Sequence, residues 1–271
     1  MSAFTAYFDA SGTEHDQLCL AVAGFVSTTD KWVEFDQRWN ERLAKDGIKY
    51  FHMNEFNNPG SKGEFRNWSY DDPRRPLLHR DLIGVITDHV DRHFGCCVIT
   101  EALNGLTLQE RQEWHLSAYA LAGRSCAAQL RLWCETWGGR VPRMVFERGD
   151  HGRGELEKIL KLNKFSDPVF EPSRDVVEGG FITKGMVPLQ AADLLAFELF
   201  DPARKIEKDD KLKRIRPSYD VLSRIPGSPR VIRIREMQIL RSLLRATRDE
   251  IWIPGSRRES PGWIGGDDAF W

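Results

Sequence analysis

The sequence predicts an α/β fold in which a central mixed sheet is flanked by helices. Two apolar, β-prone runs open the chain, at residues 3–8 and 18–26. Segments with helical spacing follow, interspersed with further short apolar runs, and no internal repeat is present. Strands first, with helices mixed in later, are typical of an α/β or α+β domain rather than a barrel, a solenoid or a helical bundle.

The individual elements follow from local patterns. The turn-rich residues 9–16 separate the first two runs, which predicts a hairpin at the start of the sheet. Thr29 and Asp30 can cap a helix over residues 31–45, where Trp32, Phe35, Trp39 and Leu43 recur at helical spacing. We expect further helices over 76–90, 109–137, 154–162, 187–200 and 231–247, and further strands over 94–100, over 141–146 and around Val169.

Composition indicates a folded chain with a substantial core. Of 271 residues, 41% are apolar and 29% charged, which is far from a disordered composition. We predict a main domain over 1–200 and a basic extension over 201–271 that contains one helix and packs on the main domain. The five cysteines are odd in number and include no CxxC pair, so we expect reduced, mostly buried thiols.

The chain carries no sequence signal for a membrane or for secretion. Its first residues, MSAFTAYFDASG, lack a basic region and reach an acid after a few apolar positions. No run approaches the roughly 18 apolar residues that a membrane-spanning helix requires. We therefore expect a cytoplasmic protein.

Positive charge is concentrated towards the end of the chain. The net charge is −1, yet residues 203–258 contain 16 Lys and Arg against 7 Asp and Glu. This excess fits either a solvated, arginine-rich helix or a surface that contacts phosphates. For the second case the predicted nucleic-acid-binding residues are Arg230, Arg233, Arg235, Arg241 and Arg245.

Three acids occupy positions from which a scaffold can aim them at a shared point. Asp9 ends the first predicted strand and Glu147 ends the run 141–146. Carboxyl ends of neighbouring strands in open α/β sheets commonly border the ligand crevice. Asp193 lies in a helix that is apolar around most of its circumference, where an unpaired carboxylate is costly and a metal ion would offset that penalty.

Neighbouring polar residues suggest supporting roles. Gln190 lies three residues before Asp193, on the same helical face, from which its amide can orient a carboxylate or a metal-bound water. Ser11 and Gly12 can form a tight turn that brings backbone close to a phosphate. Each feature alone is weak, because an acid at a strand end is more often a turn former or a solvated residue.

Four short motifs together resemble a known family. They are Phe8-Asp9-Ala10-Ser11-Gly12, Ala23-Gly24-Phe25-Val26, Phe51-His52 and Leu189-Gln190-Ala191-Ala192-Asp193. In order and separation, over about residues 4 to 200, they are similar to the ribonuclease H-like family catalogued as domain of unknown function 3800. The resemblance implies a ribonuclease H-like sheet and a nuclease activity.

The resemblance also assigns residues. Most members of the family have Glu where this chain has Ala10, and Asp9 can keep its role because successive side chains in a strand point to opposite faces. Glu147 matches the family's middle acid, with Asp150 as the alternative. His52 would assist proton transfer near the metals, and Glu55 would be a further metal ligand. The alternative for His52 is a histidine on the surface or in the core with no catalytic role.

These residues suit phosphodiester chemistry. Two divalent ions about 3.5 to 4 Å apart can activate a water and stabilise the leaving oxygen. Carboxylate oxygens favour Mg²⁺ or Mn²⁺, and no close Cys/His pairing indicates zinc. The leading hypothesis is a metal-dependent nuclease in which Asp9, Glu147 and Asp193 bind the metals. The alternatives are a non-catalytic nucleic-acid-binding or assembly protein with the same fold, and a phosphohydrolase of small nucleotides.

Overall fold

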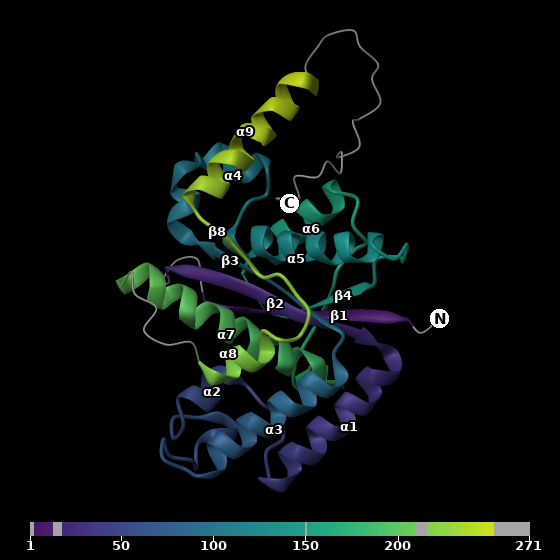
Figure 1. Cartoon of the computed structure of the whole chain (residues 1–271), viewed down its shortest axis with the longest axis vertical. Helices are drawn as coiled ribbons and strands as arrows, with labels where there is room; N and C mark the ends of the chain where they lie inside the picture. The colour runs from purple at the N-terminus through teal and green to yellow at the C-terminus, as the bar shows by residue number, and fades with distance from the viewer. Residues whose placement is uncertain (1–2, 13–17, 150, 210–215, 252–271) are drawn as a thin grey trace.

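The centre of the molecule is a six-stranded sheet with the strand order β5-β4-β1-β2-β3-β8 (Figure 1). The computed structural model describes residues 3–12, 18–149, 151–209 and 216–251. The strands are β1 (Phe4–Ser11), β2 (Cys19–Thr28), β3 (Arg92–Ile99), β4 (Arg143–Glu147), β5 (Val169–Glu171) and β8 (Arg230–Ile232). β2 is antiparallel to β1 and β3, and the other pairs are parallel. A mixed sheet flanked by helices confirms the predicted fold class.

Helices lie on both faces of the sheet. They are α1 (Thr29–Lys45), α2 (Met53–Asn57), α3 (Arg74–His89), α4 (Leu108–Glu113), α5 (Ala118–Glu135), α6 (Arg153–Leu162), α7 (Val187–Asp209), α8 (Pro217–Leu222) and α9 (Ile234–Ile251), with short 3-10 turns at Gly63–Phe65 and Thr100–Gly105. A separate two-stranded sheet is formed by β6 (Val176–Glu178) and β7 (Phe181–Thr183). Figure 1 shows α5 and α6 on one side of the sheet and α1 and α3 on the other.

Apolar cores on both faces of the sheet hold these layers together. On one face Phe8 of β1 packs with residues of α5, α6 and α9. On the other, Ala23 and Phe25 of β2 pack with residues of α1, α3 and α7. Because side chains alternate along a strand, β1 contributes Ala6 and Phe8 to the first core, and its odd-numbered residues face α7. We refer below to these two sides as the α5 face and the α7 face.

The first helix forms for the reason the sequence indicates. Trp32, Phe35, Trp39 and Leu43 are all buried, which confirms the predicted apolar stripe. The helix begins slightly earlier than expected, since Thr28 is its N-cap and accepts a hydrogen bond from the backbone of Lys31.

Two predicted boundaries are wrong. The expected helix over 109–137 is divided into α4 and α5, because His115 adopts a left-handed backbone conformation (φ 53°) and Ser117 caps a new helix. The domain boundary predicted after residue 200 falls inside α7, which continues to Asp209. The extension contains two helices, α8 and α9, rather than the single helix expected. It also contributes a strand, β8, which pairs with β3 in the central sheet.

Gly24 allows β1 and β2 to approach closely. A Cβ atom at this position would lie 1.8 Å from the carbonyl oxygen of Tyr7. We expect Gly24→Ala to lower the free energy of unfolding by about 1–3 kcal/mol, the usual result of overpacking. Gly84, in α3, has open space around it, so Gly84→Ala should raise that free energy by about 0.5–1 kcal/mol. Urea titrations of both variants test this, and an unaffected Gly24→Ala protein would contradict it.

The state of the cysteines and the character of the helices can be compared with the sequence expectations. The five cysteines are buried and carry free thiols, as predicted. None of the helices in the described residues combines the length and the apolar character needed to cross a membrane.

Candidate functional site

Asp9 and Glu147 lie on neighbouring strands and on the same face of the sheet. Phe8 pairs with Phe146 in the parallel β1–β4 register, and their rings stack on the α5 face with centroids 5.0 Å apart. Alternation therefore places the next residues, Asp9 and Glu147, on the α7 face. Asp9 is buried, and its Oδ1 accepts a hydrogen bond from the backbone N of Ala10.

The side chain of Ala10 points away from this face. Ala10 packs against the core on the α5 face, opposite to Asp9. A longer acidic side chain at position 10 would therefore not extend towards Glu147 from within the strand. The departure from the family motif leaves the placement of Asp9 unchanged.

Asp193 is buried in α7 and held by the start of α2. Its Oδ2 accepts a 2.6 Å hydrogen bond from the backbone N of Met53. Burial raises the pKa of Asp193; the charge of His52 and the Met53 hydrogen bond act in the opposite direction, and the charge of Glu55 adds to the rise. The structure thus brings three of the predicted residues, Asp193, His52 and Glu55, into one neighbourhood.

His52 and Glu55 differ in how firmly they are held. The Nδ1 atom of His52 is buried and has no hydrogen-bond partner among the described residues. Glu55 is fixed through Oε1 by the hydroxyl of Tyr50 (3.0 Å) and by Arg174 (3.2 Å), and through Oε2 by the backbone N of Glu64 (3.1 Å). Glu55 therefore acts as a fixed anion near Asp193.

Gln190 serves as a connector between segments rather than as the predicted partner of an acid. Its Oε1 accepts hydrogen bonds from the indole of Trp39 (2.9 Å) and the backbone N of Phe51 (2.8 Å). Its Nε2 donates to the backbone oxygen of Ser173 (2.9 Å). The amide thus joins α1, the segment before α2 and the segment before β6, and it positions the surroundings of Asp193.

Ser173 extends this connection to Glu147. Its hydroxyl donates to Oε1 of Glu147 at 3.3 Å, and its backbone carbonyl is held by Gln190. Neither Ser173 nor the contact of Trp39 with Gln190 is evident from the sequence, because Ser173 belongs to no motif and Trp39 lies 151 positions from Gln190. Asp150, the alternative to Glu147, lies outside the described residues.

Gly12 follows β1 directly, and protein atoms occupy the space beside it; residues 13–17, which would complete the predicted turn, lie outside the described residues. Gly12 has a positive φ of 89°, and a Cβ there would lie 2.6 Å from both the carbonyl oxygen of Cys19 and the ring of Phe200. Ser11 pairs with Ala21 in the sheet. Packing against Phe200 explains Gly12 without a phosphate.

The predicted three-ligand metal centre is not assembled within the described residues. No group of three or more His, Cys, Asp and Glu side chains there could hold a metal ion. Asp9 and Glu147 are positioned by the sheet, and Asp193 is positioned separately by α7 and the backbone of Met53.

The predicted arginines do not share the face of the acids. Arg241 and Arg245 of α9 bind Glu110, and these hydrogen bonds, with one from the backbone of Thr107, lower the pKa of Glu110 to about 2. α9 packs on the α5 face through Met237 and Leu240. The other three, Arg230, Arg233 and Arg235, lie on or just after β8, at the opposite edge of the sheet from β4 and β5. The five arginines predicted to bind nucleic acid therefore do not border the acids on the α7 face.

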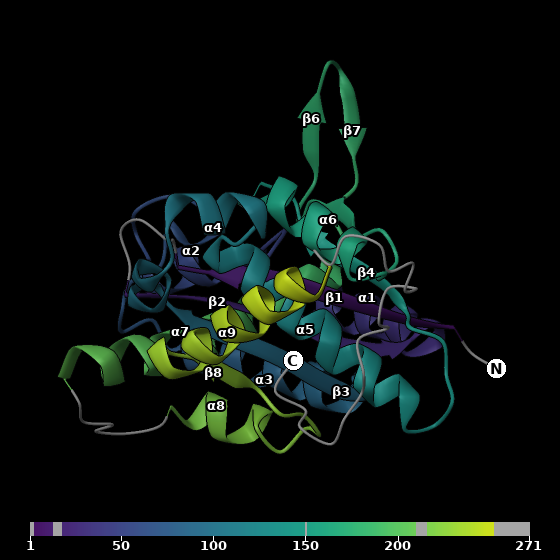
Figure 2. The same ribbon diagram turned by 90° about the horizontal axis from the view of Figure 1, so that it is seen from above.

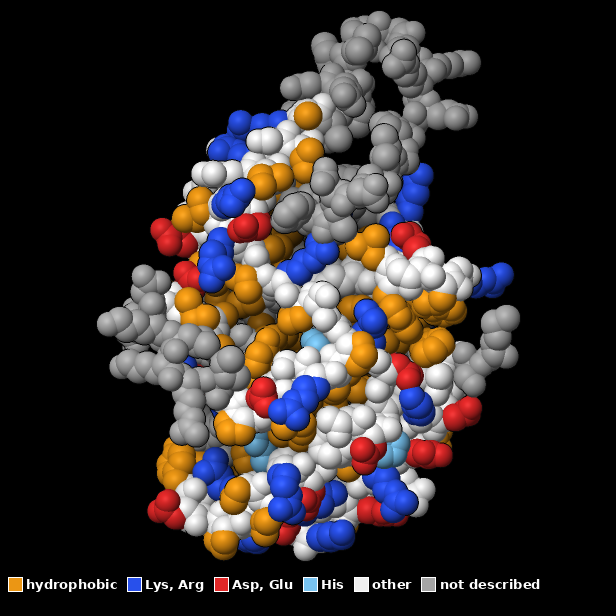
Figure 3. All heavy atoms as spheres, viewed as in Figure 1, with side chains coloured by type: hydrophobic (Ala, Val, Ile, Leu, Met, Phe, Trp, Pro, Cys, Tyr) orange, Lys and Arg blue, Asp and Glu red, His pale blue; other side chains and the backbone are white. Residues whose placement is uncertain are grey.

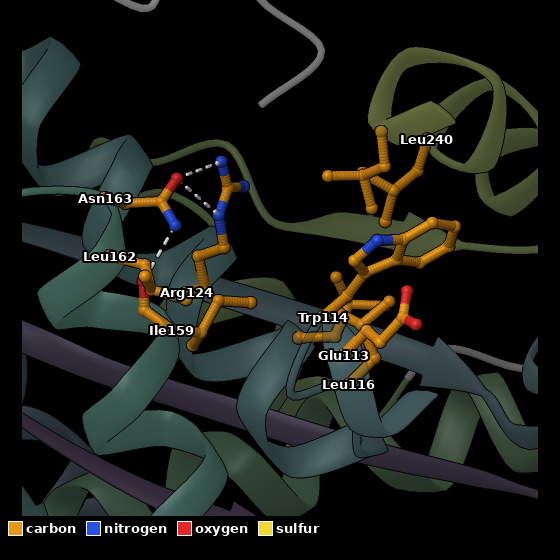
Figure 4. Close-up of a pocket in the computed structure, with 10 residues that line it drawn as sticks. Glu113, Trp114, Leu116, Arg124, Ile159, Leu162, Asn163 and Leu240 are labelled. Carbon is orange, nitrogen blue, oxygen red and sulfur yellow. Dashed lines mark hydrogen bonds between the residues drawn. The ribbon is translucent and has the colours of Figure 1, made fainter. Parts of the chain in front are cut away.

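Charge on the surface is correspondingly mixed. On the face shown in Figure 3, Lys and Arg side chains are interspersed with acids and apolar groups, including around α9 at the top of the view. A cavity of about 170 Å³ lies on the α5 face and is lined mainly by apolar residues such as Trp114, Ile159 and Leu240, whose side chains are drawn in Figure 4. Arg124, in the same cavity, is bound to Asn163. This cavity is separate from the acids on the α7 face.

Asp36 introduces a pH dependence near β1. Burial raises its pKa from 3.8 to about 6, and its Oδ1 has no hydrogen-bond partner among the described residues. The folded state therefore favours the protonated form, so stability should fall as the pH rises from about 4 through about 6 and then level off.

The variant Asp36→Asn should remove this dependence. Partial exposure screens the charge, so we expect the variant to be more stable at pH 7 by about 1 kcal/mol and equal to the wild type near pH 3. Thermal melts across this pH range provide the measurement. Parallel stability profiles for the two proteins would contradict the expectation.

Comparison with known proteins finds similarity in structure but none in sequence. No family model matches the sequence, and no curated protein matches it. The chain is similar to the crystal structure of the ribonuclease H2 from Pyrococcus horikoshii OT3, with 14% sequence identity over 80% of each chain and a TM-score of 0.37.

Proposed function

We propose that this chain is a ribonuclease H-like, metal-dependent nuclease of the family whose motifs it resembles. The observation that carries the proposal is the placement of Asp9 and Glu147 side by side on the face against which α7 buries Asp193. Acids at adjacent strand positions repel one another unless a cation or a proton lies between them. Such an arrangement is typical of a functional site rather than of a stabilising one.

By ligand type these acids suit Mg²⁺ or Mn²⁺, although among the described residues they do not form one group of three ligands. Carboxylate oxygens of Asp9, Glu147 and Asp193 are hard ligands, and burial disfavours the charge on Asp193, which a bound cation would balance. Bound divalent ions would activate a water and stabilise the charge that develops during in-line displacement at a phosphodiester. The substrate is a nucleic acid strand that presents such a bond to the α7 face.

The chain's own residues position these groups. The Met53 amide fixes one oxygen of Asp193, and the Ser173 hydroxyl fixes one oxygen of Glu147. His52, with its buried Nδ1 atom beside Asp193, transfers a proton during hydrolysis. Gln190 and Glu55 are positioning residues, since they hold the segments from which these groups project.

The test is a cleavage assay on the full chain. Labelled single- and double-stranded DNA and RNA, together with mononucleotides, are incubated with Mg²⁺, with Mn²⁺ or with a chelator. We expect metal-dependent cleavage of at least one polynucleotide, lost in Asp9→Asn and retained in Asp88→Asn, an exposed acid of α3. Binding without cleavage would favour a non-catalytic protein, and hydrolysis of mononucleotides alone would favour a small-nucleotide phosphohydrolase.

A further inference from the structure

The β6–β7 hairpin projects from the body of the molecule (Figure 2). Among the described residues its two strands pair only with each other, and they are joined by Gly179 and Gly180, which both have positive φ angles (57° and 84°). This two-glycine connection is the form that a tight hairpin turn favours. The hairpin exposes Phe181 to 81%, Val177 to 69% and Ile182 to 62%. Large apolar side chains clustered on a projection indicate a binding role.

The base of the hairpin is fixed to the candidate site. Ser173, just before the first strand, binds Glu147, and Arg174 binds Glu55. The base is closed where the backbone N of Met186 donates to the carbonyl oxygen of Pro172. The chain then enters α7, which carries Asp193. Anything held by the hairpin is thereby held at a set position relative to the acids.

The two faces of the hairpin differ in what lies beside them. Val177 pairs with Ile182, so these two apolar side chains share one face. Glu178 pairs with Phe181 and shares the other face with it. Glu178 also binds Arg148, the residue after Glu147, at 3.3 Å. The face that carries Phe181 is therefore the one turned towards the end of β4 and its acid.

We propose that Phe181 stacks on a base of the nucleic acid strand whose phosphodiester lies at Asp9, Glu147 and Asp193. This inference rests on the proposed function and adds the element that grips the substrate. An aromatic ring binds any base through its π-face, so the contact is tolerant of sequence. Arg148 and Arg174 are partly exposed, with side-chain exposures of 36% and 49%, and both lie between the hairpin and the acids. Their guanidinium groups can contact the phosphates of the same strand.

A protein partner fits these observations less well. Docking through apolar area alone would use Val177 and Ile182 at least as much as Phe181, since they form a continuous pair on one face. The aromatic residue instead lies on the face that leads to the acids and carries the link to Arg148. Stacking predicts that the two faces contribute unequally, which an experiment can measure.

The experiment compares oligonucleotide binding by variants of full-length Asp193→Asn protein, which prevents cleavage during the measurement. Fluorescence anisotropy with labelled single-stranded DNA and RNA gives the Kd. We expect Phe181→Ala and Phe181→Leu to weaken binding about tenfold, because stacking contributes about 1–3 kcal/mol per base. Phe181→Tyr should bind as the parent does, and Ile182→Ala, the matched apolar control on the other face, should change Kd less than twofold.

Each remaining outcome is decisive. Unchanged affinity in Phe181→Ala, with cleavage by the wild type intact, would overturn this inference alone. Wild-type protein that neither cleaves nor binds any oligonucleotide would overturn the proposed function together with it. Equal losses in Phe181→Leu and Ile182→Ala, or a dimer in sedimentation that Phe181→Ala abolishes, would assign the hairpin to a protein partner. Thermal melts should be unchanged throughout, because the substituted side chains are exposed.

Discussion

Replacing Asp193 by Asn is expected to lower metal-dependent cleavage by on the order of 10³-fold or more, with the fold intact. A metal-binding carboxylate contributes several kcal/mol to transition-state stabilisation, and each 1.36 kcal/mol changes the rate tenfold. The Asn side chain keeps an oxygen that can accept the Met53 hydrogen bond. Single-turnover cleavage and thermal melts of both proteins provide the measurements.

Stability separates a catalytic role of Asp193 from a structural one. Burial raises the pKa of Asp193, so folding disfavours the ionised carboxylate relative to the unfolded chain. Without metal, Asp193→Asn should therefore be at least as stable as the wild type. Added Mg²⁺ or Mn²⁺ should raise the Tm of the wild type and have little effect on the variant. A variant that cleaves normally, or one that unfolds with or without metal, would contradict this assignment.

Gln190→Leu is expected to lower the free energy of unfolding by about 3–6 kcal/mol. The substitution leaves the Trp39 indole, the Phe51 amide and the Ser173 carbonyl without their partner. The two buried groups, on Trp39 and Phe51, each cost about 1–3 kcal/mol when left unsatisfied, and the partly buried Ser173 carbonyl costs less. Urea titrations measure the change, and cleavage should fall as well because Ser173 also positions Glu147.

Two variants control for this interpretation. Gln37→Leu removes an exposed glutamine from α1 and should change stability by less than about 0.5 kcal/mol. Gln190→Glu keeps both acceptor interactions and regains a donor when it is protonated, so its stability should approach that of the wild type as the pH falls. Equal losses in Gln190→Leu and Gln37→Leu would show that the connecting role of Gln190 is wrong.

Residues within one element were the most predictable from the sequence. The stripe of Trp32, Phe35, Trp39 and Leu43 required only helical spacing, and Asp193 was identified because its helix is otherwise apolar. Asp9 and Glu147 were identified because each follows an apolar run; Glu147 does end β4, whereas β1 continues past Asp9 to Ser11. The spacing of apolar residues along a helix or strand predicts these features, because each element buries one face.

Features that depend on long-range contacts were not predictable. Gln190 meets Trp39 across 151 positions of sequence, and no local pattern records that contact. β6 and β7 are only three residues each, too short for an alternating pattern to emerge. The positions of Arg241 and Arg245 were not predictable either, because their charge does not indicate which face of the sheet α9 covers. Met237 and Leu240, which pack in the core on the α5 face, determine that placement.

The pairing of β8 with β3 has a consequence for how the chain is made. Residues Cys96–Val98 of β3 lie beside Arg230–Ile232, which are synthesised more than a hundred residues later. At a translation rate of about 5–20 residues per second, a nascent chain waits on the order of ten seconds before this partner leaves the ribosome. Throughout that interval a strongly apolar strand has an open edge, which is a template for intermolecular pairing. Newly made protein is thus most prone to aggregate before its C-terminal third has emerged.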